Sequence, residues 1–119
     1  MTNSTAELTT ITYVSHSLIK SSELEQQLKE IEGVASANNA KVEISGILLF
    51  RRNRFIQRLE GPKAAIDSLI EVIKQDKRHR KFTTLYYGQI PQRYFTDWSK
   101  MEIAYQRKKL DELDQLLVN

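Results

Sequence analysis

Three polar side chains of this 119-residue chain stand at spacings that could bring them together for chemistry. Gln57 lies in a strand-favouring run and shares one face of the predicted strand with the large apolar side chains two residues away on either side. An unpaired buried carboxamide costs roughly 1–3 kcal/mol, so Gln57 requires polar partners. A second run, rich in β-branched residues, places Tyr13 and Ser15 on one face of another strand, and both can supply hydroxyl groups.

The elements that must position these residues can be predicted from the sequence. Strand-favouring runs over residues 44–50 and 55–59 flank the basic turn 51–54, and this pattern predicts a β-hairpin. A first strand is predicted over residues 8–15, a fourth over 82–87 and a fifth within 94–103 around Trp98.

Two helices are predicted from apolar residues at helical spacing. The first covers residues 22–37, begins with a capping box of Ser22 and Glu25, and is closed by Asn38 and Asn39. The second begins at Pro62, since proline suits the first helical position. A short amphipathic helix is predicted over residues 108–118.

The order of these elements predicts the fold class. It is an α+β, ferredoxin-like βαββαββ arrangement: a mixed five-stranded sheet with two helices on one face, plus a short C-terminal helix. The first and third strands are neighbours at the centre of such a sheet, so Tyr13 and Gln57 would meet beneath the helices. A flat ligand rich in donors and acceptors could then lie between the helices.

Composition excludes several classes of protein. There are no cysteines, which excludes disulfides, thiolate metal sites and a cysteine nucleophile, and with only His16 and His79 no histidine metal site is expected. No apolar run approaches the ~20 residues of a membrane span and no signal sequence is visible, so a cytoplasmic protein is expected. We expect disorder over residues 1–7, one domain over 8–105 and the amphipathic helix within 106–119.

Six short motifs are more specific than any of these patterns. The run from Phe55 to Gly61 (FIQRLEG), followed by Asp-x-Arg-His at the end of the second helix, is the most specific pair. The full set is Tyr13-Val14-Ser15, Asn38-Asn39, Ile44-Ser45-Gly46, Phe55-Ile56-Gln57-Arg58-Leu59-Glu60-Gly61, Asp76-Lys77-Arg78-His79 and Phe95-Thr96-Asp97-Trp98-Ser99. From about Leu8 to Tyr105 the chain resembles the blue-light-using-flavin (BLUF) photoreceptor domain.

The resemblance implies a light sensor, not an enzyme, that binds oxidised FAD, with FMN or riboflavin left open. It implies that Tyr13 and Gln57 are photoactive, and that Ser15, Trp98 and Met101 modulate them. The flavin-binding residues that it implies are Gln57, Asn38, Asn39, Ile31, Ile73, Asp76, Arg78 and His79. Glu60 is expected to pair with a nearby arginine or to cap the second helix.

The sequence departs from the family pattern at three places. Glu43 stands where glycine is usual, Ser45 stands where threonine is usual, and Lys100 separates Met101 from the Trp-Ser pair that it usually follows. Either a bulge returns Met101 to its usual place or the local packing is changed.

Three hypotheses for function remain. In the first, a stand-alone flavin sensor signals to a partner protein of unknown identity through the sheet's outer face or the terminal helix, which could also mediate self-association. In the second, a flavin-free ferredoxin-like domain binds nucleic acid through its basic hairpin and exposed aromatics such as Tyr86 or Tyr87, although it lacks the aromatic strand signature of RNA-binding sheets. The third, an acylphosphatase-type enzyme, lacks a glycine-rich phosphate loop.

Overall fold

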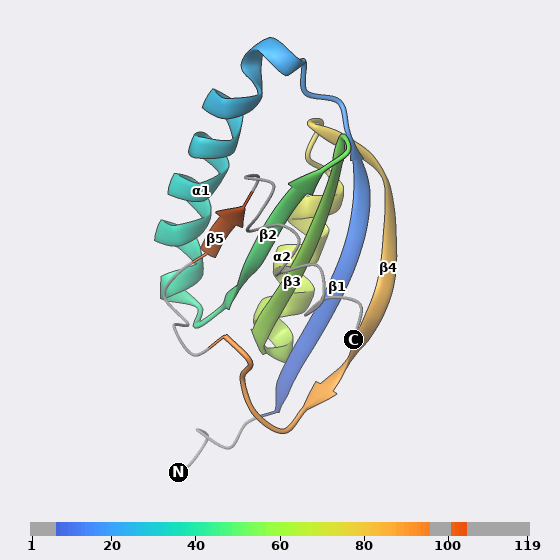
Figure 1. Ribbon diagram of the computed structural model, residues 1–119. Coiled ribbons are helices and arrows are strands. Elements are labelled where there is room, and N and C mark those ends of the chain that lie inside the picture. The colour runs from blue at the N-terminus through green and yellow to red at the C-terminus, as the bar shows by residue number, and fades with distance from the viewer. Residues whose placement is uncertain (1–6, 96–100, 105–119) are drawn as a thin grey trace.

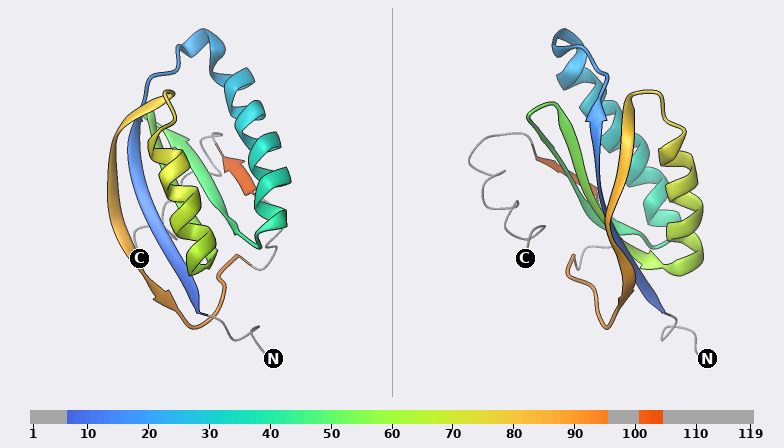
Figure 2. Two further views of the ribbon diagram at one scale, coloured as in Figure 1. Left: turned by 180° about the vertical axis from the view of Figure 1, so that it is seen from behind. Right: turned by 90° about the vertical axis from the view of Figure 1, so that its right-hand side faces the viewer.

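The computed structural model describes residues 7–95 and 101–104. Its elements are β1 (Leu8–Ser17), the 3-10 turn η2 (Ser21–Glu23), α1 (Leu24–Lys41), β2 (Ser45–Arg51), β3 (Arg54–Pro62), α2 (Lys63–Lys74), β4 (His79–Ile90) and β5 (Met101–Ala104). The strands form one sheet of order β4-β1-β3-β2-β5. β1 to β4 pair antiparallel, whereas the short β5 runs parallel to β2. Both helices cover the same face of the sheet, which confirms the α+β prediction (Figures 1 and 2).

The core lies between the helices and the sheet. Alternation along the strands sends every second side chain toward the helices, and most of these buried positions are apolar. In α2, Ile66 and Ile70 form the buried stripe. The buried members of this core are Ile11, Tyr13, Leu28, Ile44, Leu48, Phe50, Phe55, Leu59, Ile66 and Ile70.

The predicted hairpin is present, and its turn is tighter than the sequence suggested. β2 and β3 are joined by Arg52 and Asn53 alone, both in the left-handed region with φ of 54° and 62°. Positive φ at both central residues is the geometry of a type I′ turn, whose twist matches that of the flanking strands. The pairing of Arg51 with Arg54 closes the hairpin.

Glu43 stands where glycine is usual in the family pattern, and its backbone has a conformation that suits glycine. Its φ is 60°, which places a non-glycine residue in the left-handed region between α1 and β2. Gly46, three residues later, is required for a different reason: a Cβ atom there would lie 2.1 Å from the carbonyl oxygen of Arg58 on β3. The close approach of β2 and β3 therefore depends on the missing side chain.

The predicted boundaries of the first helix are wrong at both ends. Ser22 makes no capping box, because Ser21–Glu23 form the η2 turn, whose N-cap is Lys20 without a side-chain cap bond, and α1 begins only at Leu24. Asn38 and Asn39 do not close the helix, which continues to Lys41. Neither asparagine adopts a positive φ, and the left-handed residue comes at Glu43 instead.

Tertiary pairing also moves the strand boundaries. β4 extends well beyond the predicted residues 82–87, because β1 offers it partners from Ser17↔His79 to Leu8↔Ile90. The fifth strand, predicted within 94–103, is described as β5 at Met101–Ala104, so it overlaps the end of that range and extends one residue beyond it. α2 begins at Lys63, with Pro62 as its N-cap. The expected disorder over residues 1–6, Trp98 and the expected helix over 106–119 lie outside the described residues.

No helix within residues 7–95 and 101–104 is both long and apolar enough to cross a membrane.

Candidate functional site

A cleft opens between the two helices above the centre of the sheet. Its walls are apolar side chains of α1 and α2, its floor is formed by β1, β2 and β3, and its rim is polar. The walls are Ile31, Val34, Leu69, Val72 and Ile73; the floor is Tyr13, Leu48, Phe55 and Gln57; the rim is Asn38, Asp76, Arg78 and His79. An apolar slot with polar groups along its edge suits a flat ring that carries donors and acceptors on its periphery.

At the floor of this cleft, Tyr13 and Gln57 form a buried pair. They are register partners on the adjacent strands β1 and β3, and the Tyr13 hydroxyl donates a hydrogen bond to Oε1 of Gln57. Tyr13 is 3% exposed and Gln57 is 5% exposed. Because the amide oxygen faces the phenol, the amide NH₂ group of Gln57 faces away from it, in an orientation assigned from this hydrogen bond.

Burial keeps the Tyr13 phenol protonated. Loss of solvation raises the pKa of Tyr13 far above its ordinary value, and the negative charge of Asp76 raises this pKa further. The ring stacks on Phe82 of β4 with a centroid separation of 4.4 Å and an interplanar angle of 27°. Phe82 was not identified from the sequence as part of the site; it was predicted only as the first residue of the fourth strand.

His79, the first residue of β4, uses both ring nitrogens within the protein. Nδ1 lies 2.6 Å from Oγ of Ser15, and Nε2 lies 2.6 Å from the carbonyl oxygen of Ile73 near the end of α2. Ser15 is fully buried and is not among the side chains that line the cleft, whereas its partner His79 is.

Asp76 and Arg78 form an ion pair at the rim. Arg78 Nη2 lies 2.6 Å from Oδ2, Arg78 Nε lies 2.9 Å from Oδ1, and the Arg78 backbone N–H donates to Oδ1 at 2.9 Å. These hydrogen bonds from Arg78 hold the pKa of Asp76 below its ordinary value. The pair thus presents an ordered, charged edge to the cleft.

The structure brings together most of the residues predicted for the site. Ile31, Asn38, Ile73, Asp76, Arg78 and His79 surround the Tyr13–Gln57 pair. Asn39 lies in α1 and Met101 begins β5, but their side chains are not among those described. Trp98 and Lys100 fall outside the described residues.

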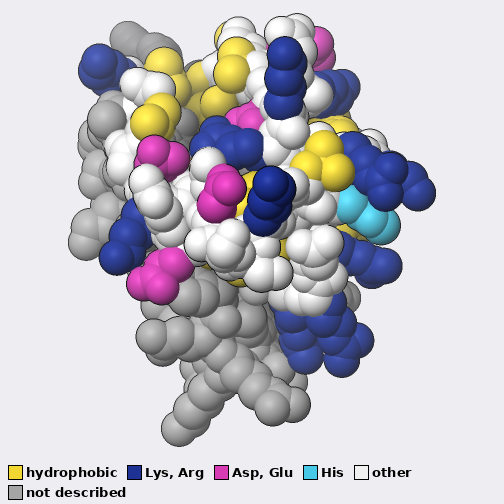
Figure 3. Space-filling view, turned by 90° about the horizontal axis from the view of Figure 1, so that it is seen from above, with side chains coloured by type: hydrophobic (Ala, Val, Ile, Leu, Met, Phe, Trp, Pro, Cys, Tyr) yellow, Lys and Arg dark blue, Asp and Glu magenta, His cyan; other side chains and the backbone are white. Residues whose placement is uncertain are grey.

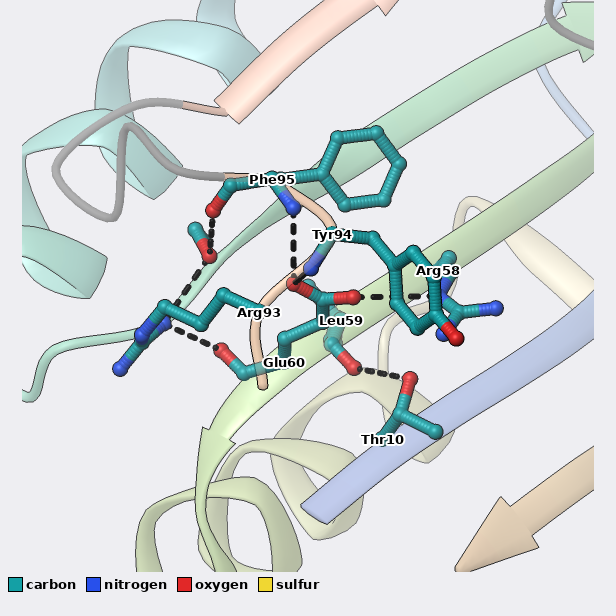
Figure 4. Close-up of polar contacts among 8 residues, drawn as sticks. Thr10, Arg58, Leu59, Glu60, Arg93, Tyr94 and Phe95 are labelled. Carbon is teal, nitrogen blue, oxygen red and sulfur yellow. Dashed lines mark hydrogen bonds and ion pairs between the residues drawn. The ribbon is translucent and has the colours of Figure 1, made fainter. Parts of the chain in front are cut away.

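Sequence reasoning missed a second polar network, on the opposite face of the sheet. We call it the outer-face network: Arg58, Glu60, Arg93, Tyr94 and Phe95 (Figure 4). Oε1 of Glu60 accepts hydrogen bonds from the backbone N–H groups of Tyr94 at 2.8 Å and Phe95 at 3.0 Å. Its Oε2 lies 3.3 Å from Nε of Arg58, whose guanidinium also lies over the Tyr94 ring at 4.7 Å. Glu60 therefore pairs with an arginine, as expected, and does not cap α2.

Arg93 completes the outer-face network. Its Nη1 donates to Ser45 Oγ at 3.0 Å and to the Glu60 carbonyl at 3.3 Å, and its Nη2 donates to the Glu43 carbonyl at 2.7 Å. Ser45 in turn donates to the Phe95 carbonyl at 3.0 Å. Residues 93–95 are thereby fixed to β2 and β3.

Basic residues gather at the hairpin end of the sheet. Figure 3 shows Lys and Arg side chains around a histidine on this end. His16 pairs in register with Arg54 of β3 and Arg80 of β4. Desolvation and the charges of Arg54, Lys81 and Arg80 lower the pKa of His16. The aromatic residues expected to stack on bases lie away from this basic end of the sheet. Tyr86 pairs with Thr12 and Tyr87 with Ile11, nearer the other end of β1.

Comparison with known proteins agrees with the geometry of the cleft. Residues 8–101 match the BLUF family, described as sensors of blue-light using FAD. Among curated relatives, photoactivated adenylate cyclase subunit alpha of Euglena gracilis is 37% identical over 95 residues, which is 80% of this chain but 9% of that protein. The blue light- and temperature-regulated antirepressor BluF of Escherichia coli (strain K12) is 35% identical over 88 residues, 74% of this chain and 21% of that protein. The chain thus spans a small part of each of these two curated relatives.

Solved structures agree as well. The dark-state structure of BlrB, a BLUF protein, aligns with a TM-score of 0.75 and 33% identity, covering 94% of this chain and 85% of that one. Klebsiella pneumoniae BlrP1, determined with FMN and cyclic diGMP, aligns with a TM-score of 0.77 and 31% identity, covering 91% of this chain and 30% of that one. The chain belongs to the BLUF family of blue-light sensors.

Proposed function

We propose that this domain binds an oxidised flavin, FAD or FMN, in the cleft between α1 and α2, and that Tyr13 and Gln57 form its light-driven switch. The observation that carries the proposal is the buried hydrogen bond from the Tyr13 hydroxyl to Gln57 Oε1 on the floor of this cleft. The residues present fit a flavin: the apolar walls suit its ring system, and the polar rim suits its carbonyl and ribityl oxygens.

The proposal assigns separate roles in flavin binding and in photochemistry to residues of the cleft. Ile31 and Ile73 hold the ring from either helix, and Asn38 and Arg78 provide donors at the rim. When bound and excited, flavin supplies a strong oxidant that accepts an electron and a proton. Tyr13 is the donor of both, because its raised pKa keeps the phenol protonated.

Gln57 is the switch because a carboxamide has both a donor end and an acceptor end. Gln57 would receive the proton of Tyr13 at Oε1 and release one from its nitrogen end toward the flavin. When the electron and a proton return to Tyr13, the amide would be left with its donor and acceptor ends exchanged. A new hydrogen bond from Gln57 to a flavin carbonyl would lower the excitation energy and produce a small red shift that decays in darkness.

The experiment is the visible absorption spectrum of the protein before and after blue light. Gln57→Leu is expected to abolish the red shift while flavin stays bound, because leucine preserves the side chain's bulk and offers no hydrogen bond. Gln89→Leu, at an exposed position of β4, is the matched control and should keep the full shift. A normal red shift in Gln57→Leu would refute the role of Gln57.

We further propose that the signal passes to a partner protein or effector domain. The relatives named as a photoactivated adenylate cyclase and as an antirepressor show two kinds of output in this family. A pull-down with the protein in the dark and in blue light tests this proposal, and a partner retained equally in both states would contradict it.

A further inference from the structure

The ring of His79 is held between α2 and β1. A carbonyl oxygen can only accept a hydrogen bond, so the 2.6 Å contact with the Ile73 carbonyl requires a proton on Nε2. In the neutral ring Nδ1 then carries a bare lone pair, and the 2.6 Å contact with Ser15 is a hydrogen bond donated by the Ser15 hydroxyl.

The surroundings of the His79 ring are largely aromatic. Three aromatic rings face it, with centroid separations of 6.5 Å to Tyr13, 6.2 Å to Phe55 and 6.5 Å to Phe82. The nearby carboxylate, Asp76, already receives hydrogen bonds from Arg78. Asp76 is therefore ion-paired with Arg78, and the ring nitrogens of His79 are left in contact with Ser15 and Ile73.

The bond from Ser15 has a consequence for the network around Gln57. Ser15 is fully buried and has a single hydroxyl proton, so once that proton points at His79 the oxygen offers only lone pairs to other neighbours. Ser15 pairs with Phe55, which makes it the diagonal neighbour of Gln57 across β1 and β3, within reach of a long side chain.

We propose that His79 is a positioning residue that fixes the direction of hydrogen bonding around Gln57, and not a flavin ligand. The proposal rests on the proposed function. Tyr13 donates to the oxygen end of the Gln57 amide, and Ser15, fixed by His79, presents an acceptor to the nitrogen end. Both neighbours then stabilise the same dark orientation of the amide. After light has reversed the amide, its oxygen faces the acceptor on Ser15, which destabilises the lit state. His79 and Ser15 therefore speed the recovery of the dark state.

The kinetic test uses variants that keep or remove the acceptor for Ser15. His79→Gln keeps a donor toward the Ile73 carbonyl but loses the acceptor, whereas His79→Asn keeps an acceptor near the position of Nδ1. We expect His79→Gln and Ser15→Ala each to slow dark recovery about fivefold, equivalent to about 1 kcal/mol, or one net hydrogen bond. The double variant should be no slower than either single one, and His79→Asn should recover close to the normal rate. His16→Gln, at the half-buried histidine of the same strand β1, is the control and should leave recovery unchanged.

Two further readouts separate the alternatives. A tenfold loss of flavin affinity in His79→Gln with unchanged recovery would make His79 a ligand and overturn the proposal. Additive slowing of dark recovery in the double variant would also overturn the proposal. Imidazole ¹⁵N NMR of the flavin-free protein should show the Nε2–H tautomer for the neutral ring of His79, and an Nδ1–H tautomer would overturn the assignment. This measurement stands even if the chain binds no flavin, an outcome that would instead refute the proposed function.

Discussion

Glu60→Gln is the sharpest test of the outer-face network. The side chain is fully buried, and its carboxylate accepts two backbone N–H groups at 2.8 and 3.0 Å as well as the Arg58 guanidinium. Glutamine keeps a neutral oxygen for the two N–H groups, but charge-assisted hydrogen bonds are roughly twice as strong as neutral ones. The two bonds therefore lose about 2 kcal/mol together. Arg58, whose side chain is 17% exposed, loses its counter-ion at a cost of about 1 kcal/mol more.

The expected loss is thus about 3 kcal/mol in the free energy of unfolding, measured by urea denaturation at pH 7. The matched control is Glu71→Gln, since Glu71 pairs with Lys74 at 3.6 Å on the exposed face of α2 and should contribute less than about 0.5 kcal/mol. Equal effects of the two substitutions would refute the reasoning, because the buried carboxylate would then contribute no more than a surface one.

Three other predictions follow from the backbone and from Tyr13. Glu43→Gly should raise the free energy of unfolding by about 0.5–1 kcal/mol, because glycine adopts a φ of 60° without strain; a lower thermal midpoint would contradict this. Gly46→Ala should cost about 3 kcal/mol, because its Cβ would meet the Arg58 carbonyl oxygen at 2.1 Å; an unchanged urea midpoint would show that β2 can shift freely. The raised pKa of Tyr13 means that the unfolded chain loses the phenol proton first, so stability is unaffected below about pH 10 and falls above it by up to about 1.4 kcal/mol per pH unit. Alkaline denaturation of Tyr13→Phe should lack this part of the slope.

The pairing of Tyr13 with Gln57 could be predicted because two independent constraints agree on it. Alternation places each residue on one face of its strand, and the order of elements makes those strands neighbours. The register that opposes them is then set by the hydrophobic pattern, since a slip by one residue would send Phe55 and Leu59 to the other face. The family resemblance added the residues of the rim.

The end of α1 shows where local signals fail. Asparagine tolerates the left-handed backbone that closes many helices, and this favoured Asn38 and Asn39 as the last residues. The helix nevertheless continues to Lys41, and the left-handed residue is Glu43. The backbone preference of a single residue type contributes little free energy. The connection from α1 into the start of β2 at Ser45 therefore decides where the helix ends.

The burial of Glu60 could not be predicted from the local sequence pattern. Alternation places its side chain on the face away from the helices, where a charged side chain is ordinarily solvated. Its burial depends on residues 93–95, which lie more than 30 positions away and fold back over β3. One signal was available in the sequence. Ile47, Leu49 and Ile56 also alternate onto that outer face and are apolar, and in the structure they cluster with Phe95. Apolar side chains on both faces of a central hairpin indicate that both faces are covered, and a glutamate among them then needs donors, which the backbone of Tyr94 and Phe95 supplies.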